Sequence, residues 1–378
     1  MSVGLKDSLK LIGVTIVTFC AVFVCTFFLN FYIDAQALDM SAASIETAIM
    51  YDAQMATSKL TCAISGGFLG LIAVVMLVFY IKLYIDGHEK QLGILKAMGY
   101  SDGKIALGFS VFGVSVLIGT ALGFGAGFII MPTVYEGMTI VGLPEIAITF
   151  NPVLLLLIVL PTLVFSAFSC LYSYFALRRP VSEMLRGKSG ASPKIKVKAE
   201  KERGFTKEMC IKTLFGKKSL AFFVAFAAFC FSAMVQMAVS MLDLSTETMG
   251  GIILVIGVVL AVTTIFMAIT TLVNGNVKNI AMMKAFGYSM KECSLTVLGG
   301  YRIFAAIGFA VGTVYQYVLL SLMVNIVYKD VTAVPEYNFN VPVFFITLAL
   351  FAVFYEAVML LYTYKIGKIS VKTVMLED

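Results

Sequence analysis

Long, uninterrupted apolar runs dominate this sequence and constrain its fold more than any other feature. Each run is long enough to cross the hydrocarbon core of a bilayer as a helix, which takes about 20 residues. Only 13% of the residues are charged and 60% are hydrophobic, so the solvent of these runs must be lipid. Within lipid every backbone polar group must pair inside the chain, which leaves helices or closed barrels. Because the runs lack the alternation of barrel strands, the sequence predicts an all-α membrane protein with eight spans, at residues 11–31, 60–81, 105–131, 152–172, 220–241, 250–273, 295–327 and 341–362.

The lysines and arginines indicate how the spans are oriented. Of the 28 basic residues, only Lys59 and Lys329 fall in the loops of one side of the predicted bundle. Basic residues are retained on the cytoplasmic side, so both termini are predicted to be cytoplasmic, in agreement with an even number of spans. The basic run at 194–203 could contact nucleic acid, but a solvated linker beside anionic lipid headgroups explains it, and no nucleic-acid partner is expected.

An internal repeat divides the chain into two halves. The segment Gly87-His-Glu-Lys-Gln-Leu-Gly-Ile-Leu-Lys-Ala-Met-Gly-Tyr-Ser101 matches Gly275-Asn-Val-Lys-Asn-Ile-Ala-Met-Met-Lys-Ala-Phe-Gly-Tyr-Ser289, which begins 188 residues later. Two Gly, two Lys, Ala, Tyr and Ser occupy the same positions in both. Further matches join Ile118-Gly-Thr-Ala-Leu-Gly123 to Ile307-Gly-Phe-Ala-Val-Gly312, and Phe150-Asn-Pro-Val153 to Phe339-Asn-Val-Pro-Val343.

Each half holds four predicted spans, so both halves begin on the same side of the membrane. Such halves are parallel repeats related by an axis along the membrane normal, whereas inverted repeats would need an odd number of spans. The predicted boundaries are 1–177 for the first four-helix unit, 178–206 for a cytoplasmic linker and 207–378 for the second four-helix unit.

The two repeated segments are longer than a connection between spans requires, since about two to eight residues suffice. Their apolar residues recur at three-residue steps, which indicates a short amphipathic helix that a glycine then ends. Such a helix could dock in a groove of a cytoplasmic partner or lie on the membrane surface, and the pattern favours neither. The candidate docking residues are Lys90, Leu92, Leu95, Lys96, Met98 and Gly99 in the first segment, and Lys278, Ile280, Met283, Lys284, Phe286 and Gly287 in the second.

The run Lys90-Gln-Leu-Gly-Ile-Leu-Lys-Ala-Met-Gly-Tyr-Ser101 resembles the signature of FtsX-like (MacB- and BceB-type) ABC transporter permeases. Its usual form is basic-Glu-Ile-Gly-Ile-Leu-Arg-Ala-Leu-Gly-small. The resemblance extends to the glycine-rich third span and to Leu177-Arg-Arg-Pro-Val-Ser-Glu-Met-Leu-Arg186, and it covers the chain as two units. It implies that each repeated segment contacts one ABC ATPase subunit, so that one chain binds two copies.

The same resemblance implies a function. A permease of this family couples ATP hydrolysis to export or membrane extraction of an amphipathic substrate, such as a peptide, a lipid or an antibiotic. The expected location is the plasma membrane of a bacterial cell. Two features depart from the family pattern: Gln91 and Asn279 replace its acidic residue, and the large outer domain of MacB-like or BceB-like members is absent.

The chain itself is not expected to be an enzyme. Gly216-Lys-Lys-Ser219 is similar to the end of a phosphate-binding loop, but Ile211 stands where the first glycine of that loop belongs. We therefore expect no catalytic residue, cofactor or metal in this chain, and we expect ATP and Mg in the partner ATPase.

Two other functions remain open. One is a regulator, in which ATP hydrolysis acts on a partner at the outer face and nothing is transported; the short outer loops offer such a partner little surface. The other is a secondary transporter, which would place ionisable residues inside the spans of both halves. Only the second half does so, at Arg302 and Glu356. An ABC ATPase encoded by the neighbouring gene would favour the permease.

Two further sets of residues concern the packing of the spans. Arg302 and Glu356 each lie about nine residues from the same predicted face, roughly 13 Å deep, on consecutive antiparallel spans. We expect them to form an intramembrane ion pair, whereas the corresponding positions of the first half, near Gly113 and Phe168, are uncharged. The second set fits small-xxx-small packing of helices and consists of Gly119, Gly123, Gly127, Gly308 and Gly312.

Overall fold

The structure is a computed structural model that describes residues 11–38, 44–137, 146–186, 210, 213–214, 218–244, 247–327 and 337–367. Within these residues the regular structure is helical, and eight helices are long and apolar enough to cross a membrane. This confirms the predicted all-α membrane protein with eight spans. The eight helices are α2 (Ile12–Ala35), α3 (Ile45–Gly87), α6 (Gly113–Gly137), α7 (Leu156–Leu177), α10 (Lys218–Leu244), α11 (Glu247–Asn274), α14 (Tyr301–Val327) and α15 (Val341–Gly367).

Helix α3 extends well beyond its predicted span. It begins at Ile45 because Ser44 caps it: the Ser44 side chain accepts a hydrogen bond from the backbone N–H of Thr47. The apolar span of α3 is Gly66–Gly87 rather than 60–81, so residues 45–65 continue the helix past the span. Residues 45–59, which the predicted spans leave in an outer loop, are therefore helical.

Helix α14 begins later than predicted. The seventh span was expected from residue 295, but the turn at Gly299 and Gly300 separates α13 (Met290–Leu298) from α14, which starts at Tyr301. Consecutive glycines favour such a break, because glycine loses more conformational entropy than other residues when it enters a helix. Arg302 consequently stands in the first turn of its helix instead of about nine residues inside it.

The chain forms two compact units. Unit 1 comprises residues 1–188 together with 240–256 and 319–338, and unit 2 comprises residues 189–239, 257–318 and 339–378. Helices α2, α3, α6 and α7 belong to unit 1, whereas α15 and most of α10, α11 and α14 belong to unit 2. The predicted linker lies largely outside the described residues, so its boundaries stay a prediction.

Each unit buries its own apolar core. In unit 1, Phe23, Phe27 and Phe31 recur at four-residue steps on α2 and pack with Met131 and Tyr135 on α6. In unit 2, the core joins α10, α11, α14 and α15 and includes residues of the short helices α12 (Val277–Ala285) and α13. Helix α2 also contacts α3, and α6 contacts α7, within unit 1.

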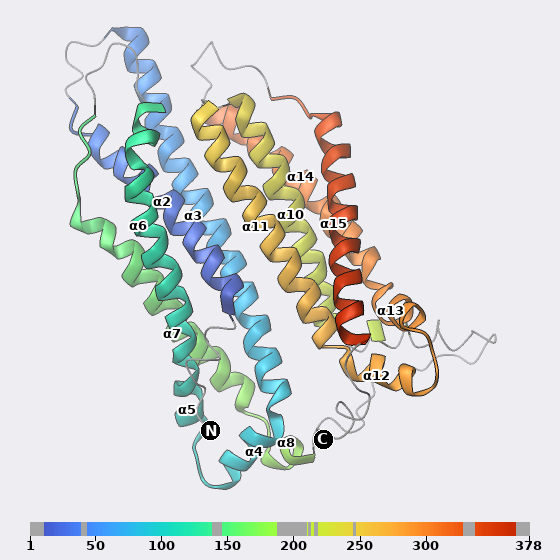
Figure 1. The fold of residues 1–378 in the computed structure, drawn as a ribbon. Coiled ribbons are helices and arrows are strands. Elements are labelled where there is room, and N and C mark those ends of the chain that lie inside the picture. Colours follow the sequence, from blue (N-terminus) through green and yellow to red (C-terminus); the bar gives the residue numbers. More distant parts are fainter. Residues whose placement is uncertain are drawn as a thin grey trace. The chain divides into compact units, whose positions relative to one another are not determined.

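Short helices cluster at one end of each unit (Figure 1). In unit 1 these are α4 (Glu89–Ala97), α5 (Asp102–Leu107) and α8 (Val181–Arg186), at the end where α3 and α7 terminate. A 3₁₀ turn, η2 (Gly108–Phe112), joins α5 to α6, and η3 (Pro152–Leu155) precedes α7. In unit 2 these are α12 and α13, which connect α11 to α14 along the chain. The repeated segments of the sequence thus form α4 and α12.

Candidate functional site

A glycine in the left-handed conformation ends the short helix in each unit. Gly99 has a φ of 91° and Gly287 a φ of 87°. The N–H of the following tyrosine bonds the carbonyl five residues back, Tyr100 to Leu95 and Tyr288 to Met283, each at 3.2 Å. This is a Schellman motif, which requires glycine because a Cβ disfavours positive φ. Gly99 and Gly287 therefore set the length of α4 and α12.

The serine two residues later starts the next helix in each unit. Ser101 accepts a hydrogen bond from the backbone N–H of Lys104, and Ser289 accepts one from that of Glu292. In unit 2 the Glu292 carboxylate also accepts from the Ser289 backbone N–H, at 2.9 Å, which completes a capping box. The Ser289 hydroxyl and backbone N–H hold the pKa of Glu292 below its ordinary value of 4.5, because they stabilise the carboxylate.

Three of the predicted docking residues are buried inside their own unit. Leu92 on α4 is buried, and Ile280 and Met283 on α12 belong to the core of unit 2. Residues three apart do not stay on one helix face, because three residues rotate by about 300°, which is about 60° short of a full turn. Leu92 and Met98, two such steps apart, therefore point about 120° away from each other. Leu92, Ile280 and Met283 therefore anchor their helices and cannot offer a surface to a partner. Leu95 is half-buried.

The exposed apolar residues of α4 and α12 form a small surface one turn long. In unit 1, Ile94 is 50% exposed and Met98 is 63% exposed. In unit 2, the matching residues Met282 and Phe286 are 42% and 69% exposed. We call each pair the apolar tip of its unit. Ile94 and Met282 are not among the predicted residues, although their four-residue spacing from Met98 and Phe286 marks a common helix face.

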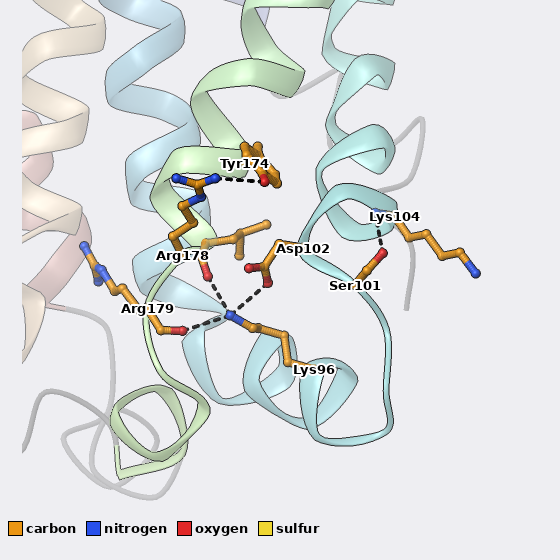
Figure 2. A network of polar contacts seen from close by, with 8 residues as sticks. Lys96, Ser101, Asp102, Lys104, Tyr174, Arg178 and Arg179 are labelled. Carbon is orange, nitrogen blue, oxygen red and sulfur yellow. Dashed lines mark hydrogen bonds and ion pairs between the residues drawn. The ribbon is translucent and has the colours of Figure 1, made fainter.

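The ammonium of Lys96 joins three segments of unit 1 (Figure 2). It donates to the carbonyl oxygens of Leu177 at 2.7 Å and Arg179 at 2.8 Å, and it pairs with the Asp102 carboxylate at 2.8 Å. Two of its N–H groups donate hydrogen bonds to the carbonyls, its charge is paired with the carboxylate, and the side chain is only 11% exposed. Leu177 is the last residue of α7, so the positive charge also offsets the negative end of that helix dipole.

The other predicted lysines differ from Lys96. Lys90 is exposed on α4, and Lys284, the counterpart of Lys96 in unit 2, is half-buried. The side chain of Lys278 lies outside the described part of the chain. Lysine at a repeated position thus does not imply one common environment.

A second set of contacts holds the turn between α7 and α8 against α4. Arg179 Nη1 lies 3.4 Å from Glu89 Oε1 and 3.8 Å from Asp86 Oδ1, at the junction of α3 with α4. Helix α8 packs on α4 where Gly93 has no side chain, since a Cβ there would stand 3.0 Å from the Cβ of Met184. Helix α4 is consequently held by α8 on one side and by the Lys96 network on another.

The predicted packing glycines lie at close helix crossings inside each unit. A Cβ added to Gly119 or Gly123 on α6 would collide with backbone carbonyl groups of α2. A Cβ added to Gly308 or Gly312 on α14 would collide with carbonyl groups of α10. Gly127 is less tight, with Thr26 Cβ 3.0 Å from the added atom. The absence of side chains allows the helix backbones to approach closely, as membrane helices require for tight packing.

The structure brings Arg302 and Glu356 together. Arg302 Nη2 lies 2.7 Å from Glu356 Oε2, and the two side chains are 45% and 42% exposed. The repeat places Pro152 with Pro342 and Tyr172 with Tyr362, so the counterpart of Glu356 in unit 1 is Ser166 and not Phe168.

The counterpart of Arg302 is Gly113, and a Cβ on Gly113 would collide with the Ser166 hydroxyl. The positions that form the ion pair in unit 2 therefore form a close helix contact in unit 1.

The predicted first span ends at residue 31, but α2 continues to Ala35 and the structure buries Asp34 near its end. Its carboxylate accepts hydrogen bonds from Asn30 Nδ2 at 2.7 Å and Tyr135 OH at 2.8 Å, and Thr149 donates to it as well. These bonds tie α2 to α6 and to the segment before α7. The signal in the sequence was the four-residue spacing of Asn30 and Asp34 within an apolar run.

Comparison with known proteins adds one match. The model of the FtsX-like permease C-terminal family matches residues 63–180 and 251–371, which together are more than half of the chain. The two matched segments begin 188 residues apart, the spacing of the internal repeat, and each contains one of the helices α4 and α12. Comparisons with curated proteins and with solved structures gave no significant match.

Proposed function

Because the chain belongs to the FtsX-like permease family and is thus the permease component of an ABC transporter, we propose that its two apolar tips dock two ABC ATPase subunits. The repetition of the tip carries this proposal. In both units a buried residue anchors a short helix, a glycine ends it, and an exposed apolar pair stands at the same two positions. Exposed apolar pairs on connecting segments favour a partner whose groove buries them.

The tips would face the cytoplasm. Nearly all basic residues fall on the side of α4 and α12 in the predicted topology, which supports this orientation. ATP and Mg would bind in the ATPase subunits, and the permease would take no direct part in hydrolysis. One permease with two tips would bind two ATPase subunits.

Charged substitutions at the tips test this proposal. The permease is purified with the ABC ATPase encoded by the neighbouring gene, and native mass spectrometry gives the subunit ratio. We expect one permease with two ATPase subunits. The variant Ile94→Glu/Met98→Glu should bind one ATPase subunit, as should Met282→Glu/Phe286→Glu, because a carboxylate in a desolvated contact costs about 1–3 kcal/mol or more.

Lys104→Glu is a matched control, because it makes the charge more negative by the same two units at an exposed position of α5 outside the tip. It should bind two subunits. Unchanged binding by both tip variants would show that the tips lie on the membrane surface, and a dominant complex of two permeases with two ATPase subunits would show that one chain is not a complete permease.

The proposed substrate is an amphipathic peptide, lipid or antibiotic, exported or extracted from the membrane. The support is the family and the apolar surfaces of the spans. ATPase activity of the complex in proteoliposomes should rise with one of these substrate classes and should not rise with soluble sugars or amino acids. Equal activity with every addition would count against transport.

A regulator that acts on an outer partner is the second candidate, and the extension of α3 favours it. Residues 45–65 continue the helix past its span, and Ile45 and Met50 on this part are exposed. Deletion of residues 46–57 would separate the two functions. If a substrate class still stimulates the ATPase activity after the deletion, transport through the spans alone is supported. If the stimulation is lost, the extension is required and the regulator is favoured.

A further inference from the structure

We infer that Lys96 is a positioning residue that makes α4, the start of α5 and the end of α7 move as one body. The inference rests on the proposed function, because it concerns how motion of a docked ATPase subunit reaches the spans. It adds a role for a side chain that points away from the docking surface. Figure 2 shows the contacts that carry it.

The direction of the Lys96 side chain is the first step. Lys96 lies two residues after Ile94 and two before Met98, which places it about 200° around the helix from each. A force on the apolar tip therefore acts on one face of α4, while the ammonium holds the opposite face. Rotation of α4 about its own axis would have to break the bonds of Lys96 first.

The partners of Lys96 are the second step, because each leads to a different span. Asp102 is the first residue of α5, which continues through η2 into α6. Leu177 is the last residue of α7, and Arg179 lies in the turn to α8. Helix α4 itself follows α3 directly. One ammonium thus connects the ends of three spans of unit 1.

The strength of this connection comes from charge and burial. Hydrogen bonds that involve a charged donor are shorter and about twice as strong as neutral ones. The Lys96 side chain is almost inaccessible, so a broken bond would leave a charge with little water to replace its partners. The carbonyl groups at the end of α7 also lack helical partners, which makes the ammonium their natural donor.

Unit 2 offers a contrast at the same place. Lys284 matches Lys96, but Met290 stands where Asp102 stands in unit 1. At this position of the repeat, unit 1 has a carboxylate and unit 2 has a thioether. We expect the two units to transmit motion unequally.

Hydrogen–deuterium exchange of the purified full-length permease tests the connection itself. In Lys96→Met, the amides of residues 174–178 should exchange about tenfold faster than in the wild type, because charge-assisted bonds no longer oppose local opening. Lys104→Met, which removes an exposed lysine of α5, should leave this exchange unchanged. Lys96→Arg keeps the charge, but its planar guanidinium cannot place its donors in the same way, so it should restore protection in part.

The same measurement on the complex with the ABC ATPase, with and without ATP, tests the transmission. In the wild type, ATP should change exchange in α4 and at the ends of α5 and α7 together. In Lys96→Met, the change in α4 should persist while the changes in α5 and α7 are lost. In Asp102→Asn, only the change in α5 should be lost, because the bonds of Lys96 to the carbonyls of Leu177 and Arg179 remain. Changes at all three sites in Lys96→Met would overturn the inference, and so would equal exchange of Lys96→Met and wild type without the partner. Absence of any change in α4 of the wild type would instead refute the docking proposal.

Discussion

The two units differ most where their last pair of spans meets. In unit 1, Gly113 at the start of α6 touches Ser166 on α7, with no room for a side chain on the glycine. In unit 2, the matching positions carry Arg302 and Glu356, whose charged groups are 2.7 Å apart. One unit joins these helices by close backbone approach and the other by a bridge of two long side chains. The contact is common to both units, but its chemistry is not.

Other features are the same in both units. The stop at Gly99 or Gly287, the exposed apolar tip and the glycine crossings recur with the same geometry. The connections behind the tip differ, since Asp102 has Met290 as its counterpart and Lys104 has Glu292. Under the proposed function, both units would dock an ATPase subunit, and each unit would respond to docking in a different way.

The largest effect is expected at the glycine crossings, where the units agree. Gly119→Leu in unit 1 and Gly308→Leu in unit 2 should each cost about 3 kcal/mol or more, because the new side chain meets a backbone that cannot move aside. Thermal unfolding of the purified variants in detergent measures the loss. Gly125→Leu is the matched control, since a Cβ there has no neighbour within 4 Å. Equal stability of Gly308→Leu and Gly125→Leu would contradict the close crossing.

The sequence predicted the spans and the repeat better than the contacts of the short helices. The spans follow from run length alone, because lipid permits few alternatives for an apolar run. The predicted docking face was partly wrong, because residues three apart in the sequence point in successively different directions around a helix. Leu92 and Met283 are therefore buried. The network of Lys96 could not be predicted, because two of its three partners are backbone carbonyls, which every residue has.

Two other differences between the predicted and the observed spans have local causes. The cap at Ser44 starts α3 well before its apolar run, and the Gly299–Gly300 turn delays the start of α14. Neither is visible in the hydrophobicity of the run itself. The pairing of Arg302 with Glu356 was predictable, because consecutive antiparallel helices lie side by side, but its position near the start of α14 was not.

A smaller effect is expected at the ion pair of unit 2. Arg302 in the first turn of α14 opposes the helix dipole, so Glu356 compensates an unfavourable charge. Arg302→Met and Glu356→Gln should each lower stability by about 1 kcal/mol, and the double variant should lose less than the sum, because both side chains are partly exposed. Thermal unfolding of the two single variants and the double variant in detergent gives the double-mutant cycle. Strictly additive losses would mean that the two residues do not stabilise each other.

The smallest effect is expected at the caps that start α5 and α13, where the units differ in one residue. Glu292 completes the cap of α13, and its pKa is lowered because Ser289 donates to the carboxylate. Lys104 stands at the matching position of α5, where no carboxylate takes part. A carboxylate with a lowered pKa stabilises the helix start fully above the ordinary value of 4.5, and that stabilisation is lost as pH falls through the lower pKa of the folded state.

Protection of the first turn of α13 against deuterium exchange should therefore decrease below pH 4.5, relative to Glu292→Gln at each pH. Protection of the first turn of α5, relative to Lys104→Gln at each pH, should not, because that ratio cancels the effect of acid on Asp102. The ratio to Glu292→Gln removes the pH dependence of intrinsic exchange, so it reports the carboxylate alone. The effect should be small, because Glu292 is exposed and water competes for its charge. If α5 and α13 lose protection together, then acid loosens both units through a common cause, and the cap is not what distinguishes them.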